Sequence, residues 1–208
     1  LPGYLSKLEQ AISEEQRCIL DELAHMTKSI DHIKEIVATQ QTYAGPTGVI
    51  EPVQIVELVE DAIRMSGDSL DRHEITVIKD YSSIPSVLLD RHQVLQILLN
   101  LINNAKHAMS GTPDQQHRIT LRLSNADGTG VILQVEDNGE GIPPENLIRI
   151  FAHGFTTRKN GHGFGLHSCI LAAQSMGGTL QAHSDGVGKG ATFTLKLPAH
   201  IDAAGGAI

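Results

Sequence analysis

Residues 90–109, DRHQVLQILLNLINNAKHAM, carry apolar side chains at the spacing of an amphipathic helix. The residues of its apolar face are Val94, Leu95, Leu98, Leu99, Ile102 and Ala105. Residues three and four apart share a helix face, so this face is expected to be buried. Asn100 and Asn104 are four residues apart and project together from the helix. The sequence therefore predicts a long helix that packs on one side and presents a pair of amides.

Segments with other periodicities lie on both sides of this helix. Strands are predicted at 49–53, 74–79, 118–123, 131–135, 179–183 and 191–197, and further helices at 55–65 and 166–176. The segment 137–165 is rich in glycine and is expected to be irregular. Helices and antiparallel strands interleave without regular β-α-β alternation, which predicts an α+β sandwich with helices on one face of a sheet.

The first 44 residues have a different pattern. Apolar or seam residues follow a 4-3-4-3 spacing at Ile19, Leu23, Met26, Ile30, Ile33, Val37 and Gln40. Such a heptad seam predicts a long coiled-coil-like helix that needs a partner helix to bury its stripe. The turn-rich residues 45–48 predict a hinge. Residues 49–200 have a mixed α and β pattern and are predicted to form the second domain, and residues 201–208 are predicted to be a frayed tail.

Composition excludes several classes of protein. The 208 residues include 16 Lys and Arg against 24 Asp and Glu, a net charge of −8, which argues against nucleic-acid binding. Two cysteines form no disulfide framework and suit the cytoplasm. No apolar run is long enough to span a membrane. The chain begins with leucine, which predicts a fragment of a longer protein, with any membrane segment outside it.

Two clusters combine polar side chains with structural context. The amide oxygens of Asn100 and Asn104 are hard ligands that suit Mg²⁺, although an exposed polar face is the simpler alternative. Asp137 follows a strand and begins Asp-Asn-Gly-Glu-Gly-Ile. Its carboxylate can accept a hydrogen bond from an exocyclic amine, and Gly139 and Gly141 let the backbone pass close to a ring. An ordinary Asx turn is the alternative.

Two further clusters lie closer to the C-terminus. Ile150-Phe151 and Phe155-Thr-Thr-Arg-Lys159 combine two aromatic rings, hydroxyls and two cations in a segment expected to form a mobile loop. Gly161-His-Gly-Phe-Gly-Leu166 opens a predicted helix, where backbone N–H groups can bind an anion. Neither this turn nor Gly188-Lys-Gly190 is a Walker or Rossmann loop. Three of the four phenylalanines lie in this part of the chain, which we interpret as a lid.

Together, the four clusters in this order resemble the sensor histidine kinases of two-component systems. Residues 100–105 resemble the N box of that family, 137–141 the G1 box, 151–157 the F box and 161–165 the G2 box. Residues 188–193 resemble its closing Gly-x-Gly strand motif. The resemblance covers about residues 49–198 and implies the Bergerat-type two-layer sandwich, in which helices cover one face of a mixed sheet. The heptad helix is similar to the second helix of the dimerisation hairpin.

The resemblance implies that the chain binds Mg-ATP and transfers the γ-phosphoryl group to a histidine of the hairpin. The implied partners are a response-regulator receiver domain, which accepts the phosphoryl group on an aspartate, and a second copy of the protein. Asn104 would bind Mg²⁺, and Asn100, Arg158 and Lys159 would share the catalytic role. The implied nucleotide-binding residues are Asn100, Asn104, Lys106, His107, Asp137, Gly139, Gly141, Ile142, Phe151, Thr156, Thr157, Gly161, His162, Gly163, Phe164, Gly165, Leu166 and Thr192.

Several residues depart from the family pattern. The phosphoacceptor motif is absent from this chain and is expected upstream; His25 and His32 are substitutes that lack the following acidic residue. His107 occupies a position where many relatives carry Lys or Arg. His153, His162, His167 and Cys169 could together hold zinc, but their spacing matches no standard pattern and polar contacts of the lid histidines are the simpler interpretation.

Two alternatives to a kinase remain open. One is a nucleotide-responsive interaction module without kinase chemistry. The other is an ATPase of the same superfamily, against which Asn100 argues, because related ATPases carry at this position a glutamate that activates water. An amide cannot abstract a proton, so transfer to a protein acceptor is favoured.

Overall fold

The computed structural model describes residues 49–111, 116–126, 130–158, 161 and 163–198, together with the helical pairs 15–16 and 22–23. The chain divides into two units, Leu1–Gly45 and Pro46–Ile208. Most of the predicted heptad helix, the predicted hinge at 45–48 and the predicted tail lie outside the described residues. Within the described part, no helix combines the length and apolar character that crossing a membrane requires.

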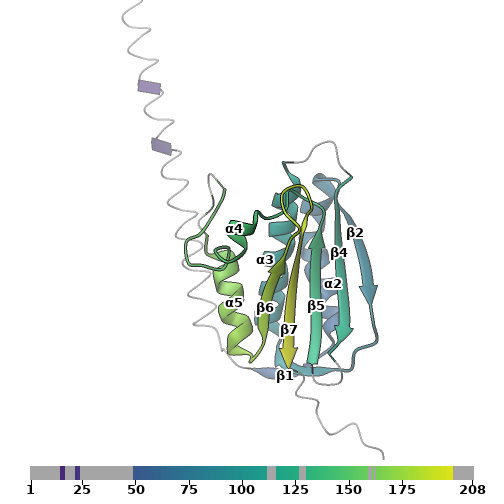
Figure 1. Cartoon of the computed structure of the whole chain (residues 1–208). Helices are drawn as coiled ribbons and strands as arrows, with labels where there is room; N and C mark the ends of the chain where they lie inside the picture. Colours follow the sequence, from purple (N-terminus) through teal and green to yellow (C-terminus); the bar gives the residue numbers. More distant parts are fainter. Residues whose placement is uncertain are drawn as a thin grey trace, which may run out of the picture. The chain divides into compact units, whose positions relative to one another are not determined.

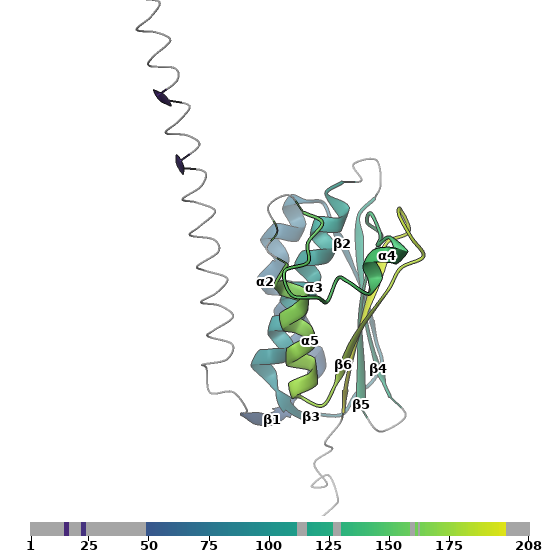
Figure 2. The same ribbon diagram turned by 60° about the vertical axis from the view of Figure 1, so that its left-hand side comes forward.

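Three helices cover one face of a five-stranded sheet (Figures 1 and 2). The helices are α2 (Ile55–Arg72), α3 (Arg91–Met109) and α5 (Gly165–Ser175). The strands are β2 (Thr76–Tyr81), β4 (Arg118–Asn125), β5 (Gly130–Asp137), β6 (Thr179–His183) and β7 (Ala191–Pro198), in the order β2-β4-β5-β7-β6. Strand β2 pairs parallel with β4 and the other pairs are antiparallel. The predicted α+β sandwich with a mixed sheet is confirmed.

Two elements were not expected from the sequence. Strand β3 (Val87–Asp90) pairs antiparallel with β1 (Ile50–Val53) in a separate two-stranded sheet. The short helix α4 (Pro144–Leu147) lies inside the segment expected to be irregular. Asp90 ends β3 and also caps α3, because its carboxylate accepts hydrogen bonds from the N–H groups of His92 at 3.0 Å and Gln93 at 3.1 Å. The strand thus fixes where α3 begins.

The core between the two layers is mainly aliphatic. Alternate residues of β4, β5 and β7 are buried against the helices, as period-two strands with one covered face require. Helix α3 contributes seven buried residues: Val94, Ile97, Leu98, Leu101, Ile102, Ala105 and Met109. Phe193 on β7 is buried with 5% of its surface exposed. This packing holds α3 against the sheet, and Ala108 near its C-terminal end contacts the loop after β5.

Candidate functional site

The first part of the site lies on α3. The Asn104 side chain is half-buried, and its Oδ1 atom accepts a hydrogen bond from the Arg158 Nη2 group at 3.0 Å. The Asn100 Nδ2 group donates to the Gln96 carbonyl oxygen at 3.2 Å. A Cβ atom on Gly165 would lie 3.1 Å from Asn100 Oδ1, so the start of α5 packs closely on this amide. The structure therefore brings together the predicted N box, the cation after the F box and the last G2 glycine.

Asp137 forms the second part of the site, at the last residue of β5. Its side chain is buried, and Oδ1 accepts a hydrogen bond from the Gly139 N–H group at 2.9 Å. Burial raises the pKa of Asp137 to about 6, although the N–H groups of Gly139 and Ala191 oppose the increase by stabilising the charge. The Asx turn anticipated as an alternative is thus present. A carboxylate that is buried in this way still has lone pairs for a donor from a ligand.

The loop after Asp137 packs against α3. A Cβ atom on Gly139 would lie 2.6 Å from the Ala108 carbonyl oxygen, so only glycine permits this approach. The Glu140 N–H group donates to the same oxygen at 2.9 Å. This contact fixes the position of the loop after Asp137 relative to α3, the helix that carries Asn104, although Asp137 lies in the sheet layer and Asn104 in the helix layer.

The same loop is joined to the turn between β6 and β7. Gly141 has a φ of 71°, and its Cβ position lies 2.1 Å from the Gly186 carbonyl oxygen. The Gly188 N–H group donates to the Glu140 carbonyl oxygen at 2.6 Å. The backbone at both G1 glycines is therefore held against protein backbone rather than left free.

Ser184 completes this junction and was missed by the sequence analysis. Its hydroxyl accepts a hydrogen bond from the Ile142 N–H group at 3.0 Å and donates to the Gly190 carbonyl oxygen at 2.6 Å. A serine directly after a strand and close to a Gly-x-Gly turn was the available signal. Its partner Ile142 lies 42 residues earlier, so the pairing is not visible in the local sequence.

The segment predicted to be a lid is anchored to the core by its aromatic rings. Phe151 and Phe155 are half-buried and pack against the core, and the Phe151 carbonyl oxygen lies 3.0 Å from His167 Nδ1. The centroids of the His153 and Phe164 rings lie 4.7 Å apart. These rings therefore fix the base of the segment, while Thr156, Thr157 and Arg158 are exposed.

Positive charge gathers beside Asn104. The Lys106 Nζ group donates to Ser69 Oγ at 3.0 Å, so this side chain turns toward α2. Loss of hydration and the guanidinium groups of Arg72 and Arg158 lower the pKa of Lys106. Loss of hydration, together with Arg158, Lys106 and His73, likewise lowers the pKa of His107, although this residue is exposed. An anion bound here would relieve the repulsion.

Some predicted residues do not join this site. Thr192 pairs with Glu136, whereas its neighbour Ala191 pairs with Asp137 and is buried. Successive strand residues point to opposite faces, so Thr192 lies on the face away from the helices. Leu166 packs against the core. Lys159 and His162 lie outside the described residues. Within the described ranges, no three His, Cys, Asp or Glu side chains gather to hold a metal ion.

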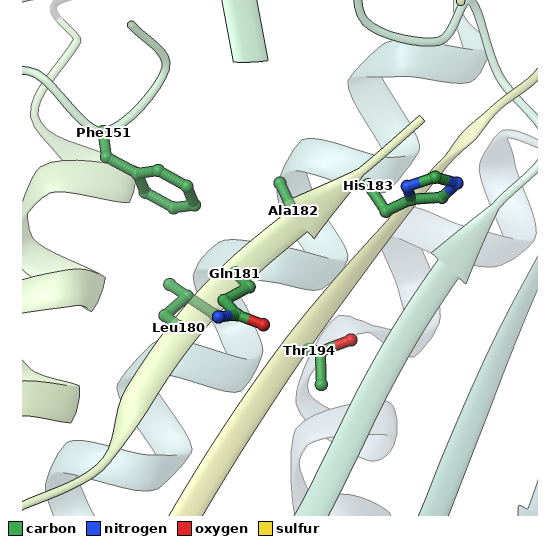
Figure 3. A pocket seen from close by; sticks show the side chains of 6 residues that line it. All are labelled: Phe151, Leu180, Gln181, Ala182, His183 and Thr194. Atoms are coloured by element: carbon green, nitrogen blue, oxygen red, sulfur yellow. The ribbon is translucent and has the colours of Figure 1, made fainter. Parts of the chain in front are cut away.

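A cavity of about 470 Å³ lies elsewhere, at the β6 edge of the sheet (Figure 3). It is lined by Phe151, Leu180, Gln181, Ala182, His183 and Thr194. Of the predicted site residues, only Phe151 lines it. We therefore place the candidate site at the close contacts around Asn104 and Asp137 and not in this cavity.

Fold and site together define a two-layer domain whose polar groups converge where α3 meets the end of a central strand. The family described as "Histidine kinase-, DNA gyrase B-, and HSP90-like ATPase" matches residues 89–201. The chain belongs to this family.

Individual relatives agree with this assignment. Sensor histidine kinase ZraS of Escherichia coli (strain K12) is 31% identical over 178 residues, which cover 85% of this chain and 37% of ZraS. Full-length ShkA, solved in complex with AMPPNP, is 26% identical with a TM-score of 0.71, and the match covers 85% of this chain and 38% of ShkA. The catalytic domain of histidine kinase ThkA has the same fold, with a TM-score of 0.65 at 23% identity over 73% of this chain and 97% of that domain.

Proposed function

We propose that the chain binds Mg-ATP between α3, the end of β5 and the Arg158 segment, and transfers the γ-phosphoryl group to a histidine. The observation that carries the proposal is the contact of Arg158 with Asn104 beside Asn100 and Gly165. An amide oxygen and a guanidinium are the groups that bind a metal–phosphate pair. Phosphoryl transfer depends mainly on this kind of positioning and charge neutralisation, and the acceptor histidine supplies the nucleophile.

The donor set near Asn104 fits Mg²⁺. This ion takes a few protein oxygens and completes its shell with water and phosphate oxygens, so a cage of several carboxylates is not required. Asn104 Oδ1 would hold the ion, with Asn100 close by. When bound, Mg²⁺ would neutralise charge on the phosphates. Arg158 would move from Asn104 to the phosphates, and His107 and Lys106 would add positive charge.

Asp137 fits the adenine end of the nucleotide. Its buried carboxylate is fixed by the Gly139 N–H group and can accept a hydrogen bond from the exocyclic amine. The Asp137–Ala191 pair and the Gly139–Ala108 contact hold this carboxylate at the α3 side of the sheet. The base would therefore lie between the sheet and α3, with its phosphates directed to Asn104.

A protein acceptor is favoured over water because position 100 carries an amide. Asn100 already donates to the Gln96 carbonyl oxygen and cannot act as a base. ZraS, a sensor histidine kinase, is more than twice the length that this chain matches. We therefore infer that the acceptor histidine lies on the dimerisation hairpin of the whole protein. A homodimer and a response-regulator receiver domain in the cytoplasm complete the proposed relay.

The proposal is tested by supplying the chain with Mg²⁺, γ-labelled ATP and the purified hairpin of the full-length protein. Acid-labile, base-stable label is expected on the hairpin histidine, and hairpin with that histidine changed to glutamine should remain unlabelled. Label on the chain itself that disappears in a His25→Gln, His32→Gln double variant would place the acceptor within this chain. Steady phosphate release that the hairpin does not alter would instead support an ATPase.

Asp137 provides a pH-dependent test of the adenine site. Replacing it with asparagine is expected to weaken ATP binding by about 10- to 100-fold, because a charge-assisted hydrogen bond is lost. In the unchanged chain, affinity should also decrease as the pH falls below about 6, since protonation removes the charge that strengthens this hydrogen bond. Isothermal titration of both proteins across pH 5 to 8 measures these effects. Protonation of ATP itself is common to both, so the difference between the two profiles reports Asp137.

The same residue has the opposite effect on the stability of the nucleotide-free domain. Its pKa is higher in the folded state than the ordinary 3.8, so the folded domain binds this proton more tightly. The contribution of Asp137 to stability should increase as the pH falls from about 7 toward 4. Asp137→Asn should therefore be more stable than the unchanged chain at pH 7 while binding ATP less well. A variant that loses stability together with affinity would contradict this account.

A further inference from the structure

Residues Thr156–Arg158 form a turn that closes on the Thr156 hydroxyl. Thr156 Oγ1 accepts a hydrogen bond from the Arg158 N–H group at 3.1 Å. The Gly161 N–H group donates to the Arg158 carbonyl oxygen at 3.2 Å. A Cβ atom on Gly161 would lie only 2.3 Å from Thr156 Oγ1, so the Gly161 backbone packs directly against this oxygen. Both backbone polar groups of Arg158 are thus engaged, the N–H group by Thr156 and the carbonyl group by Gly161.

The turn is connected to the rigid part of the domain at its start. Phe155, the residue before Thr156, is half-buried and packs against the core. The Gly154 N–H group donates to the Gly163 carbonyl oxygen at 3.2 Å, which joins the two sides of the segment. From this base the Arg158 side chain reaches α3 and donates to Asn104 Oδ1 at 3.0 Å. The guanidinium position therefore depends on the conformation of the turn.

We propose that Thr156 is a positioning residue, whose hydroxyl fixes the turn that latches Arg158 onto Asn104 before nucleotide binds. Thr156 acts through Arg158 and needs no contact with the substrate. This inference rests on the proposed function, because it assigns Arg158 a task at the phosphates. The inference adds Thr156 as a residue whose role is to position the Arg158 guanidinium.

The hydrogen bond between Arg158 and Asn104, which we call the latch, affects what must happen when nucleotide binds. Asn104 Oδ1 is both the acceptor for Arg158 and the proposed ligand of Mg²⁺. Mg²⁺ on this oxygen would repel the guanidinium cation bound to it, so arrival of Mg-ATP would displace Arg158 from Asn104. The turn would keep the displaced guanidinium within reach of the phosphates, which have stronger acceptor oxygens than an amide.

The first test uses the nucleotide-free chain. Thr156→Val removes the acceptor but keeps the branched shape, Thr156→Ser keeps the acceptor, and Thr157→Val changes the exposed neighbour as a matched control. The readout is hydrogen exchange of the Arg158 backbone amide, followed by NMR. Loss of one hydrogen bond should accelerate exchange about fivefold in Thr156→Val, with both other variants within twofold of the unchanged chain. Equal exchange in all four proteins would overturn the proposal.

The second test measures phosphoryl transfer to the supplied hairpin at saturating Mg-ATP. Thr156→Val should lower the rate about fivefold, and Thr156→Ser should restore it. In an Arg158→Gln background, Thr156→Val should have no further effect, because Thr156 acts through the guanidinium. Equal losses in both backgrounds would show a general structural role and refute the latch. If no protein transfers phosphate, the proposed function fails, while amide exchange still decides whether Thr156 orders the turn.

Discussion

Replacing Asn104 with alanine is expected to lower the rate of phosphoryl transfer to the hairpin by about 10²- to 10³-fold. The reason is that one oxygen, Asn104 Oδ1, would serve as the Mg²⁺ ligand and as the resting acceptor for Arg158. Removing a preorganised group that stabilises charge in the transition state typically has an effect of this size. The measurement is single-turnover transfer from labelled ATP, with Mg²⁺ titrated from micromolar to millimolar concentrations. The Mg²⁺ midpoint should rise in the variant.

Asn103 provides the matched control for this experiment. It is an exposed asparagine one position earlier on α3, so its side chain points about 100° away around the helix. Asn103→Ala should leave the transfer rate within twofold of the unchanged chain. If Asn104→Ala also retained its rate and its Mg²⁺ midpoint, the metal would have to be bound elsewhere and the proposed site would be wrong.

Gly141→Ala is expected to reduce the free energy of unfolding by about 2–5 kcal/mol. Two effects add at this position. The φ of 71° disfavours any residue with a Cβ atom, and that atom would lie 2.1 Å from the Gly186 carbonyl oxygen, where backbone must shift to make room. Urea denaturation followed by circular dichroism measures the loss. Because Asp137 lies four residues earlier, at the end of the strand that leads into this loop, ATP affinity should fall as well.

Gly188 separates the two effects, since it has a φ of 76° but no atom within 4 Å of its Cβ position. Gly188→Ala should therefore lose only the backbone part, about 1 kcal/mol. The difference between the two variants measures the close approach of the loop after β5 to the turn between β6 and β7. Equal losses would mean that this approach contributes nothing to stability.

Periodicity was sufficient to predict most of the fold. The residue pattern identified six of the seven described strands within about two residues of their ends, and the apolar face of α3 was visible before the structure. The prediction for α2 ended too early, at 65 instead of Arg72, because Ser-Gly-Asp-Ser resembles a turn. Leu70 is buried in the core, and Ser69 contacts Lys106 of α3, so tertiary packing extends the helix beyond its local preference.

The one described strand that was not predicted is β3, because its partner strand β1 lies far away along the chain. It has four residues, follows Pro85 and pairs with β1 more than thirty residues earlier. No local pattern predicts that pairing. Helix α4 was missed for a related reason, since four residues are too few to show helical periodicity.

The site could be predicted only where its chemistry is local. Asn104, Asp137 and Arg158 carry recognisable groups in recognisable contexts, and the structure brings Asn104 and Arg158 into contact. Side-chain direction was less predictable. Lys106 turns to α2, and Thr192 lies on the far face of the sheet because β7 pairs Ala191 with Asp137. A shift of one residue in that register would have exchanged the two faces.

The alternation of side chains along β5 also limits which insertions and deletions the gene for the domain can tolerate. Asp137 reaches the α3 side of the sheet because it is an even number of positions from the buried residues Val131, Leu133 and Val135. Deleting or duplicating a single codon within β5 would carry the carboxylate to the opposite face, whatever its neighbours are. Changes of two codons would keep the face while altering the reach of the strand. Indels in descendants of this sequence should therefore accumulate outside β5 and β7, the two strands on whose pairing the position of Asp137 depends.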